Sequence, residues 1–369
     1  MSKNCIARLV AGLAALLLAP LLCAPAWAAS AAPIRFVEAV RFATLPADVR
    51  FPEGIAGNPA TGDLFVSTFD FAAPNKLVRL DRNGRVSAVK DFGGAPLLGL
   101  EYRDGFVYIL NFGAGSLQRI PASFDAGTAV QDLVTFPSIG APDPRNERNP
   151  DGSSDTLTFG STNKQAPNAM VFDGDGNAYV SDSFQGAIFE VPAATSCHDT
   201  SSCSSITLAH DPLLATAGTP PFGANGLAFS ADGKTLFIAN TGDHRVLAMD
   251  MGTKAIRPFS ISIPGADGLL MASGMLWVAA NQADQVMALD ADGRIVIKAG
   301  EFLGVRSDGT PRGLLFPASL VAMHGWMYVT NLALPLTSDL PGDPATSLSR
   351  DEPEDFVTRW TVSRFPLPH

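Results

Sequence analysis

A pattern of short apolar runs separated by turn residues recurs along most of the chain. Each copy opens with a small or polar residue and a short apolar stretch, then turns into a second run rich in aromatic residues. The clearest copy covers 224–229, turns at 230–234 and continues over 236–240. Short apolar runs bounded by Gly, Asn, Asp and Ser are typical of β-strands. The pattern therefore predicts pairs of adjacent antiparallel strands.

Six copies of this pattern are present. The residue that opens each copy follows the previous one by 42 to 70 positions, and two further strand-like runs follow each recurrent pair. Repeats of about 40 to 50 residues with four short strands each are typical of β-propeller blades. We therefore predict an all-β fold, a six-bladed β-propeller with four antiparallel strands per blade. The opening residues are Glu53, Leu98, Asn168, Asn225, Asp267 and Ala318.

Three segments fall outside the repeats. Residues 34–45 are expected to add the outer strand of the last blade, beside a late strand near 356–363. This pairing would close the ring and remove its exposed sheet edges. Residues 138–165 are rich in Pro, Asn, Asp, Gly and Ser without periodicity, so we expect a long loop over one face. A second expected loop, 337–354, interrupts the last blade.

The first 28 residues are typical of an export signal. The basic residues Lys3 and Arg8 precede an apolar run over 9–22. Ala26-Trp27-Ala28 then matches the small-x-small pattern of a signal-peptide cleavage site. We expect a mature chain that is a single propeller domain over 29–369 and is periplasmic or secreted. No later run reaches about 18 apolar residues, so stable membrane insertion is not expected.

The amino-acid composition indicates which kinds of molecule the protein is not expected to bind. Of 369 residues, 34 are Gly and 28 are Pro, which favours many short strands over long helices. The formal net charge is −10, and loss of the expected signal peptide would make the chain more acidic still. Nucleic acids and anionic membranes are bound through patches of Lys and Arg. We therefore expect no nucleic-acid partner.

Two cysteines, Cys197 and Cys203, remain after the expected signal peptide. They lie close together in a stretch rich in Ser and Thr. In an oxidising compartment such a pair is typical of a local disulfide. The neighbouring His198 would permit metal ligation, but a fourth ligand is missing, and free thiols are the remaining alternative. We predict a disulfide between Cys197 and Cys203.

Polar residues open four of the six copies: Glu53, Asn168, Asn225 and Asp267. Innermost strands of a propeller surround a central channel, so their first residues would meet at one mouth. Carboxylate and amide oxygens suit a hard divalent cation such as Ca²⁺ or Mg²⁺, whereas zinc sites usually include His or Cys. The alternative is that these side chains only satisfy backbone groups of turns. Without a cation or protons, two converging carboxylates would repel each other.

At these residues the sequence resembles the SMP-30, gluconolactonase and luciferin-regenerating-enzyme family of six-bladed propellers, which is related to the paraoxonases. The resemblance covers about 51–330 and is strongest over 167–182, 225–240 and Asp267-Gly268. It implies one divalent cation in the channel, held by Glu53, Asn225 and Asp267. It also implies Asn168 as a further ligand or substrate contact, and Asp267 as the general base.

The sequence departs from the family at three places. Ile55-Ala56-Gly57 replaces the aromatic residue that usually follows the first Glu-Gly of the family. Ala169 follows Asn168 where the family usually has Asp. No segment matches the Arg-rich part that binds substrate in the family.

Two functions from different classes fit these observations. The resemblance implies a metal-dependent hydrolase of lactones or related esters, in which the cation polarises the carbonyl and Asp267 assists attack by water. Ca²⁺ is the favoured cation, with Mg²⁺, Mn²⁺ and Zn²⁺ as alternatives. The other function is a non-catalytic exported propeller that binds a ligand or an unknown protein partner around a structural metal. An open coordination position beside Asp267 would favour the hydrolase.

Overall fold

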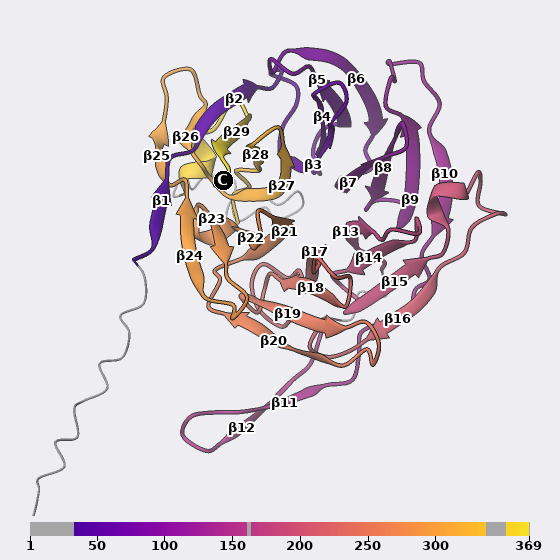
Figure 1. Cartoon of the computed structure of the whole chain (residues 1–369), viewed down its shortest axis with the longest axis vertical. Helices are drawn as coiled ribbons and strands as arrows, with labels where there is room; N and C mark the ends of the chain where they lie inside the picture. The colour runs from indigo at the N-terminus through magenta and orange to yellow at the C-terminus, as the bar shows by residue number, and fades with distance from the viewer. Residues whose placement is uncertain (1–32, 161–163, 337–351, 369) are drawn as a thin grey trace, which may run out of the picture. The chain divides into compact units, whose positions relative to one another are not determined.

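Six sheets form a ring around a central channel in the computed structural model (Figure 1). The structure describes residues 33–160, 164–336 and 352–368. The sequence-based prediction of a six-bladed β-propeller is confirmed. The innermost strands of blades 1 to 6 are β3 (Pro52–Asn58), β7 (Leu97–Arg103), β13 (Pro167–Phe172), β17 (Ala224–Phe229), β21 (Ala266–Ala272) and β27 (Pro317–Met323).

Each blade continues outward through three more antiparallel strands. The second strands are β4 (Asp63–Thr68), β8 (Phe106–Asn111), β14 (Ala178–Asp182), β18 (Thr235–Asn240), β22 (Met275–Ala280) and β28 (Trp326–Asn331). The third strands are β5 (Asn75–Leu80), β9 (Ser116–Pro121), β15 (Ala187–Val191), β19 (Arg245–Asp250), β23 (Gln285–Leu289) and β29 (Thr361–Pro366). The outermost strands are β6 (Val86–Gly93), β10 (Gln131–Thr135), β16 (Ile206–His210), β20 (Ile256–Ile261), β24 (Ile295–Ala299) and β2 (Val40–Thr44).

The hydrophobic core lies between blades rather than within one. An aromatic side chain near the start of each second strand packs in a cluster shared with the next blade. Tyr108 of blade 2, for example, packs with Met170 and Val180 of blade 3. Successive side chains of a strand point to opposite faces, so each sheet can contact both neighbours. The six aromatic residues are Phe65, Tyr108, Tyr179, Phe237, Trp277 and Tyr328.

The chain closes the ring by placing β2 beside β29 in the last blade. The two strands are antiparallel, from Val40 opposite Arg364 to Thr44 opposite Thr361, and this closure was predicted. The late strand begins at Thr361, not near 356, because a 3-10 turn, η3 (Pro353–Phe356), occupies the start of the expected range. β1 (Arg35–Val37) was not predicted as a separate strand; it pairs in parallel with β24 and gives blade 5 a fifth strand.

The insertion expected as a loop over 138–165 contains a β-hairpin, which corrects that expectation. β11 (Arg145–Arg148) pairs with β12 (Ser154–Leu157), and the hairpin extends away from the ring (Figure 1). Its tight turn is closed by hydrogen bonds between Asn149 and Ser153. A second small hairpin, β25 (Phe302–Val305) with β26 (Pro311–Gly313), precedes blade 6. Residues 1–28 and most of the predicted 337–354 loop lie outside the described residues.

Cys197 and Cys203 are joined by a disulfide in the structure, with Cα atoms 5.6 Å apart. Cys197 follows a 3-10 turn, η1 (Ala194–Ser196), and is buried in the cluster between blades 2 and 3. Cys203 packs partly against the same cluster. The bridge therefore holds the connection between β15 and β16 against the ring.

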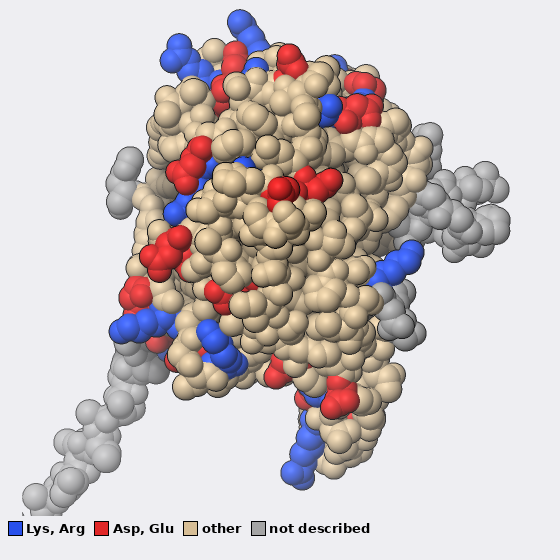
Figure 2. All heavy atoms as spheres, turned by 90° about the vertical axis from the view of Figure 1, so that its right-hand side faces the viewer, with Lys and Arg blue, Asp and Glu red and all other residues tan. Residues whose placement is uncertain are grey.

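Acidic and basic side chains are interspersed on the side of the molecule drawn in Figure 2. They do not gather there into one field of a single sign among the described residues. Within the described ranges, no helix combines the length and the apolar character that a membrane span requires.

Candidate metal centre

The four polar residues predicted to converge line one cavity at the mouth of the channel. Glu53, Asn168, Asn225 and Asp267 come from β3, β13, β17 and β21, each as the second residue of its strand. Their exposed fractions are only 3 to 5%. The cavity has a volume of about 180 Å³. The structure thus brings together all four predicted site residues, from four different blades.

A β-bulge at the start of each innermost strand turns these side chains toward the channel. In all six blades the strand register shifts between the first and fourth residues, as between Pro52 and Ile55 in β3. Bulges are used in this way to redirect a side chain. Glycine follows the site residue in several blades; a Cβ on Gly226 would clash with the carbonyl oxygen of Asp267. The small residues therefore allow the inner strands to approach closely.

Hydroxyl groups fix the direction of the two site amides. Asn168 Nδ2 donates to Ser183 Oγ at 2.9 Å, and Ser183 Oγ donates to the Ala224 carbonyl at 2.6 Å. Asn225 Nδ2 donates to Thr241 Oγ1 at 3.0 Å, and Thr241 in turn donates to a backbone carbonyl of the next blade. Because each hydroxyl gives its own proton away, it must accept from the amide nitrogen. The oxygen of each amide is therefore left available as a ligand for a cation in the cavity.

Asn281 is a site residue that the sequence analysis missed. It opens η2 (Asn281–Ala283) directly after β22, is 2% exposed and lines the same cavity. Its Nδ2 donates to Asp267 Oδ2 at 3.0 Å. Ser183, Thr241 and Asn281 each follow the second strand of blades 3, 4 and 5. That shared position in the repeat is the signal that would have found all three.

Several oxygens of the cavity are buried without a hydrogen-bond partner. They include Glu53 Oε2, Asn168 Oδ1 and Asp267 Oδ1. Burial raises the pKa of Asp267 to about 7, although a hydrogen bond from Asn281 opposes the rise. Burial, and then the charge of Asp267, hold the pKa of Glu53 well above its ordinary range. Unpartnered buried oxygens are costly, and a divalent cation among them would satisfy them.

The chemistry of the donor set fits a hard cation. In the part of the chain that the structure describes, no three His, Cys, Asp or Glu side chains cluster closely enough to hold a metal ion. The candidate donors are two carboxylates and two amides. Oxygen donors of this mixed kind suit Ca²⁺ and Mg²⁺ better than Zn²⁺.

Comparison with known proteins identifies the type of propeller. Residues 152–299, which include Asn168, Asn225 and Asp267, match the family model described as the SMP-30/Gluconolactonase/LRE-like region. The chain is SMP-30/gluconolactonase-like. No curated protein sequence matches it.

Solved structures share the fold of this SMP-30/gluconolactonase-like chain. A luciferin-regenerating enzyme aligns with a TM-score of 0.58 at 14% identity, covering 89% of this chain and 94% of that one. Regucalcin from Agrobacterium tumefaciens, described as a calcium-binding protein, aligns with a TM-score of 0.56 at 14% identity, covering 91% of this chain and 97% of that one. A gluconolactonase from Xanthomonas campestris aligns with a TM-score of 0.52 at 15% identity, covering 91% of this chain and 95% of that one. At these identities the likeness establishes the fold.

An apolar wall rises above the polar site in this SMP-30/gluconolactonase-like propeller. Its side chains come from the loops that surround the mouth and from the innermost strand of blade 2. We use "polar floor" for Glu53, Asn168, Asn225, Thr241, Asp267 and Asn281. The apolar wall consists of Phe69, Phe71, Leu98, Pro220, Pro221, Phe222, Phe316, Leu332, Leu334 and Leu336.

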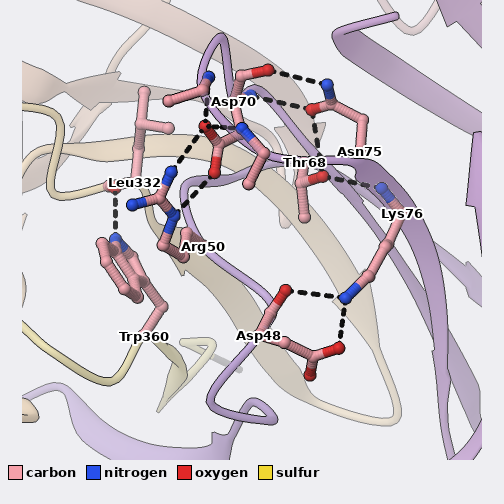
Figure 3. Close-up of polar contacts among 10 residues, drawn as sticks. Asp48, Arg50, Thr68, Asp70, Asn75, Lys76, Leu332 and Trp360 are labelled. Atoms are coloured by element: carbon pink, nitrogen blue, oxygen red, sulfur yellow. Dashed lines mark hydrogen bonds and ion pairs between the residues drawn. The ribbon is translucent and has the colours of Figure 1, made fainter. Parts of the chain in front are cut away.

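Polar contacts behind the wall hold its loops (Figure 3). Asp70, between the two wall residues Phe69 and Phe71, accepts two hydrogen bonds from Arg50 at 2.7 and 2.9 Å. Asp70 Oδ1 also accepts from the two backbone amides that follow Phe71, at 2.8 and 3.1 Å. Trp360 Nε1 donates to the Leu332 carbonyl at 3.0 Å. These contacts therefore fix the loops that carry Phe69, Phe71 and Leu332.

A second cavity of about 220 Å³ lies farther along the channel. It is lined by later residues of the innermost strands, including Glu101 of β7. Burial raises the pKa of Glu101 to about 7, although the charge of Arg103 lowers it. Glu101 lies outside the polar floor and has no role in the candidate metal centre.

Proposed function

We propose that the protein is a metal-dependent hydrolase of lactones or related esters. The observation that carries the proposal is the convergence of unpartnered buried oxygens from blades 1, 3 and 5, beside Asn225 of blade 4, at the base of an apolar mouth. The match of residues 152–299 to the gluconolactonase-like family model supports it. So does the shared fold with a gluconolactonase.

Glu53, Asn168, Asn225 and Asp267 would hold the cation. A divalent cation bound there supplies a positive charge that polarises a carbonyl group and stabilises negative charge on its oxygen. Ca²⁺ is our first candidate for this ion. Ser183 and Thr241 keep the amide oxygens of Asn168 and Asn225 directed to the site.

Asp267 is the proposed proton acceptor. Asn281 donates to its Oδ2, which leaves Oδ1 as the free carboxylate oxygen. An ionised carboxylate beside the attacking water can act as a general base. Oδ1 would take a proton from the attacking water.

The reaction is a simple addition of water across the acyl bond. A bond forms between the water oxygen and the carbonyl carbon, and the bond from that carbon to the ring or ester oxygen breaks. The proton that Asp267 accepts is passed to the leaving oxygen. A lactone gives a hydroxy acid, and an ester gives an acid and an alcohol.

We also propose that the protein acts outside the cytoplasm. The proposal is supported by the signal-like composition of residues 1–28 and by the disulfide between Cys197 and Cys203. Fractionation of the producing cell tests it directly. Full-length chain retained in the cytoplasm would contradict it.

Hydrolysis of a lactone panel by the mature protein tests the function. Each assay is run with chelator and again with Ca²⁺, Mg²⁺, Mn²⁺ or Zn²⁺ restored. We expect turnover that is lost with chelator and returns with metal. Asp267→Asn should lower kcat by at least about 100-fold, as loss of a general base does. Glu101→Gln, a carboxylate-to-amide change in the other cavity, serves as the matched control and should keep turnover.

Two outcomes would contradict the proposal. Unchanged turnover in Asp267→Asn would exclude Asp267 as the base. Tight binding of one cation without turnover of any lactone or ester would indicate the non-catalytic binding propeller instead.

A further inference from the structure

The channel mouth has a polar half and an apolar half. The residue that follows the second strand is polar in blades 3, 4 and 5, where it contacts a residue of the polar floor. In blades 6, 1 and 2 the same position holds Leu332, Phe69 and Phe112. The innermost strands follow this division in blades 6 and 2, where Ala318 and Leu98 replace polar site residues, whereas blade 1 contributes Glu53 to the polar floor. A molecule bound above the polar floor would therefore contact apolar side chains on one of its sides.

The apolar half is a packed aromatic surface. Phe69 makes edge-to-face contacts with Phe71, Phe112 and Phe222, with ring centroids 4.7, 5.5 and 6.1 Å apart. Phe222 stacks on Phe184 at 5.5 Å. These rings come from loops of several blades, and their mutual packing fixes their orientation. Phe71 is 48% exposed and extends the surface to solvent.

The described wall offers no side chain that could bind a hydroxyl group. Every polar side chain described around this cavity belongs to the polar floor, where it is buried and engaged with the candidate cation site or with a neighbour. A polyhydroxylated ring would have to leave its water hydrogen bonds without replacement. An apolar chain would instead gain from burial, by about 0.8 kcal/mol per methylene. The wall therefore selects against sugar-like substrates.

We propose that the substrate is a lactone or ester with an apolar alkyl or aryl substituent. This inference rests on the hydrolase function proposed above and names the substrate class of the same site. The carbonyl lies at the polar floor, and the substituent lies against Phe69 of blade 1, Leu332 of blade 6 and Phe222, which comes from the connection between β16 and β17. Hydrolysis then yields an apolar hydroxy acid, or an apolar acid and an alcohol.

Matched lactones of one ring size test the specificity. The cation-loaded protein is assayed with δ-lactones that carry alkyl tails of one to seven carbons, and with glucono-δ-lactone. We expect kcat/KM to rise roughly fourfold per methylene until the wall is covered. Glucono-δ-lactone should be the poorest substrate. A higher kcat/KM for glucono-δ-lactone than for the alkyl lactones would overturn the inference.

Variants link the preference to the wall. Phe222→Ser and Leu334→Ser replace half-buried wall residues and should each flatten the dependence on tail length. Ile206→Ser, at an exposed apolar residue on the outermost strand β16, is the matched control and should leave the dependence unchanged. Full chain-length dependence in both wall variants would also overturn the inference.

A series of methyl alkyl ketones separates this inference from the hydrolase function. These ketones present a carbonyl and a tail but cannot be hydrolysed, so calorimetry measures binding alone. If no lactone or ester is turned over but ketone affinity rises with tail length and falls in Phe222→Ser, the hydrolase function fails and the apolar specificity stands. If ketone affinity is independent of tail length, the apolar specificity fails whether or not lactones are hydrolysed.

Discussion

At the scale of single residues, the candidate metal centre depends on side chains that would not bind the cation themselves. Ser183 and Thr241 each accept from a site amide and donate to a backbone carbonyl. An amide without such a partner can turn and present its nitrogen, which carries no lone pair for a cation. Groups behind metal ligands commonly change metal affinity by about 10- to 100-fold.

Thr241→Val tests this role, because valine keeps the shape of threonine and removes the hydroxyl. We expect cation affinity to fall by about tenfold, measured by calorimetry. Thr235→Val, at a half-buried position on the same strand β18, is the control and should bind as the wild type does. Equal affinity in both variants would show that the Asn225 amide does not need the hydroxyl.

Glu101 gives a second prediction at this scale, on stability and pH. Its pKa is about 7 in the folded chain against an ordinary value of 4.5, so the folded state binds the proton more tightly. The contribution of Glu101 to the free energy of unfolding is fully present below about pH 4.5 and is lost as the pH rises through about 7. Glu101→Gln should therefore be more stable than the wild type at pH 8, by at most about 3 kcal/mol.

Urea unfolding of Glu101→Gln and wild type from pH 4 to pH 8 measures the effect. Other titrating groups are common to both proteins, so they cancel in the difference. We expect the free energy of unfolding of Glu101→Gln to rise relative to that of the wild type between pH 4 and pH 8. A difference that stays constant with pH would mean that Glu101 titrates normally.

At the scale of elements, the loop after β4 shows how a connection is made rigid. Asp70 is 3% exposed and receives hydrogen bonds from Arg50 and from backbone amides of its own loop. Asn75 closes the loop by accepting from the Asp70 amide and donating to the Asp70 carbonyl, both at 2.7 Å. These contacts, drawn in Figure 3, hold Phe69 and Phe71 at the cavity.

Arg50→Leu tests the importance of this network. It leaves a buried carboxylate without its charged partner, and we expect a loss of about 2 kcal/mol in the free energy of unfolding. Arg41→Leu is the control, since the Arg41–Asp308 pair is exposed at 36% and 44% and such pairs contribute less than about 1 kcal/mol. Similar losses in the two variants would show that the Arg50–Asp70 pair has no special role.

At the scale of the whole molecule, the candidate cation would connect blades 1, 3, 4 and 5. Ligands from distant parts of the chain come together only in the closed ring, so the cation binds the folded state alone. We expect Ca²⁺ at 100 times its Kd to stabilise the protein by about 2.7 kcal/mol. Thermal unfolding with chelator and with Ca²⁺ measures this shift in Tm.

Glu53→Gln supplies the comparison for this measurement. It removes one charged ligand of blade 1 and should greatly reduce the Ca²⁺-dependent shift. Glu101→Gln should keep the shift. An equal shift in Glu53→Gln and wild type would place the bound cation elsewhere in the molecule.

The local pattern of the chain was sufficient to predict the ring and the four residues of the polar floor that open innermost strands. Strand alternation and turn residues act over a few positions, so each repeat carries its own structure. Equivalent positions in equivalent blades then meet at one mouth, which is why Glu53, Asn168, Asn225 and Asp267 could be found together.

Only the tertiary structure decided the rest of the site and several details of the fold. The aromatic wall around Phe222 and the support from Arg50 arise from loops that meet across the mouth, and no short-range pattern encodes which loops meet. Asn281 shares its repeat position with Ser183 and Thr241, but only the structure showed that this position contacts the polar floor. The parallel pairing of β1 with blade 5 and the hairpin of β11 and β12 were missed for related reasons. Such contacts depend on the packing of segments far apart in sequence, whereas the repeat depends on neighbours along the chain.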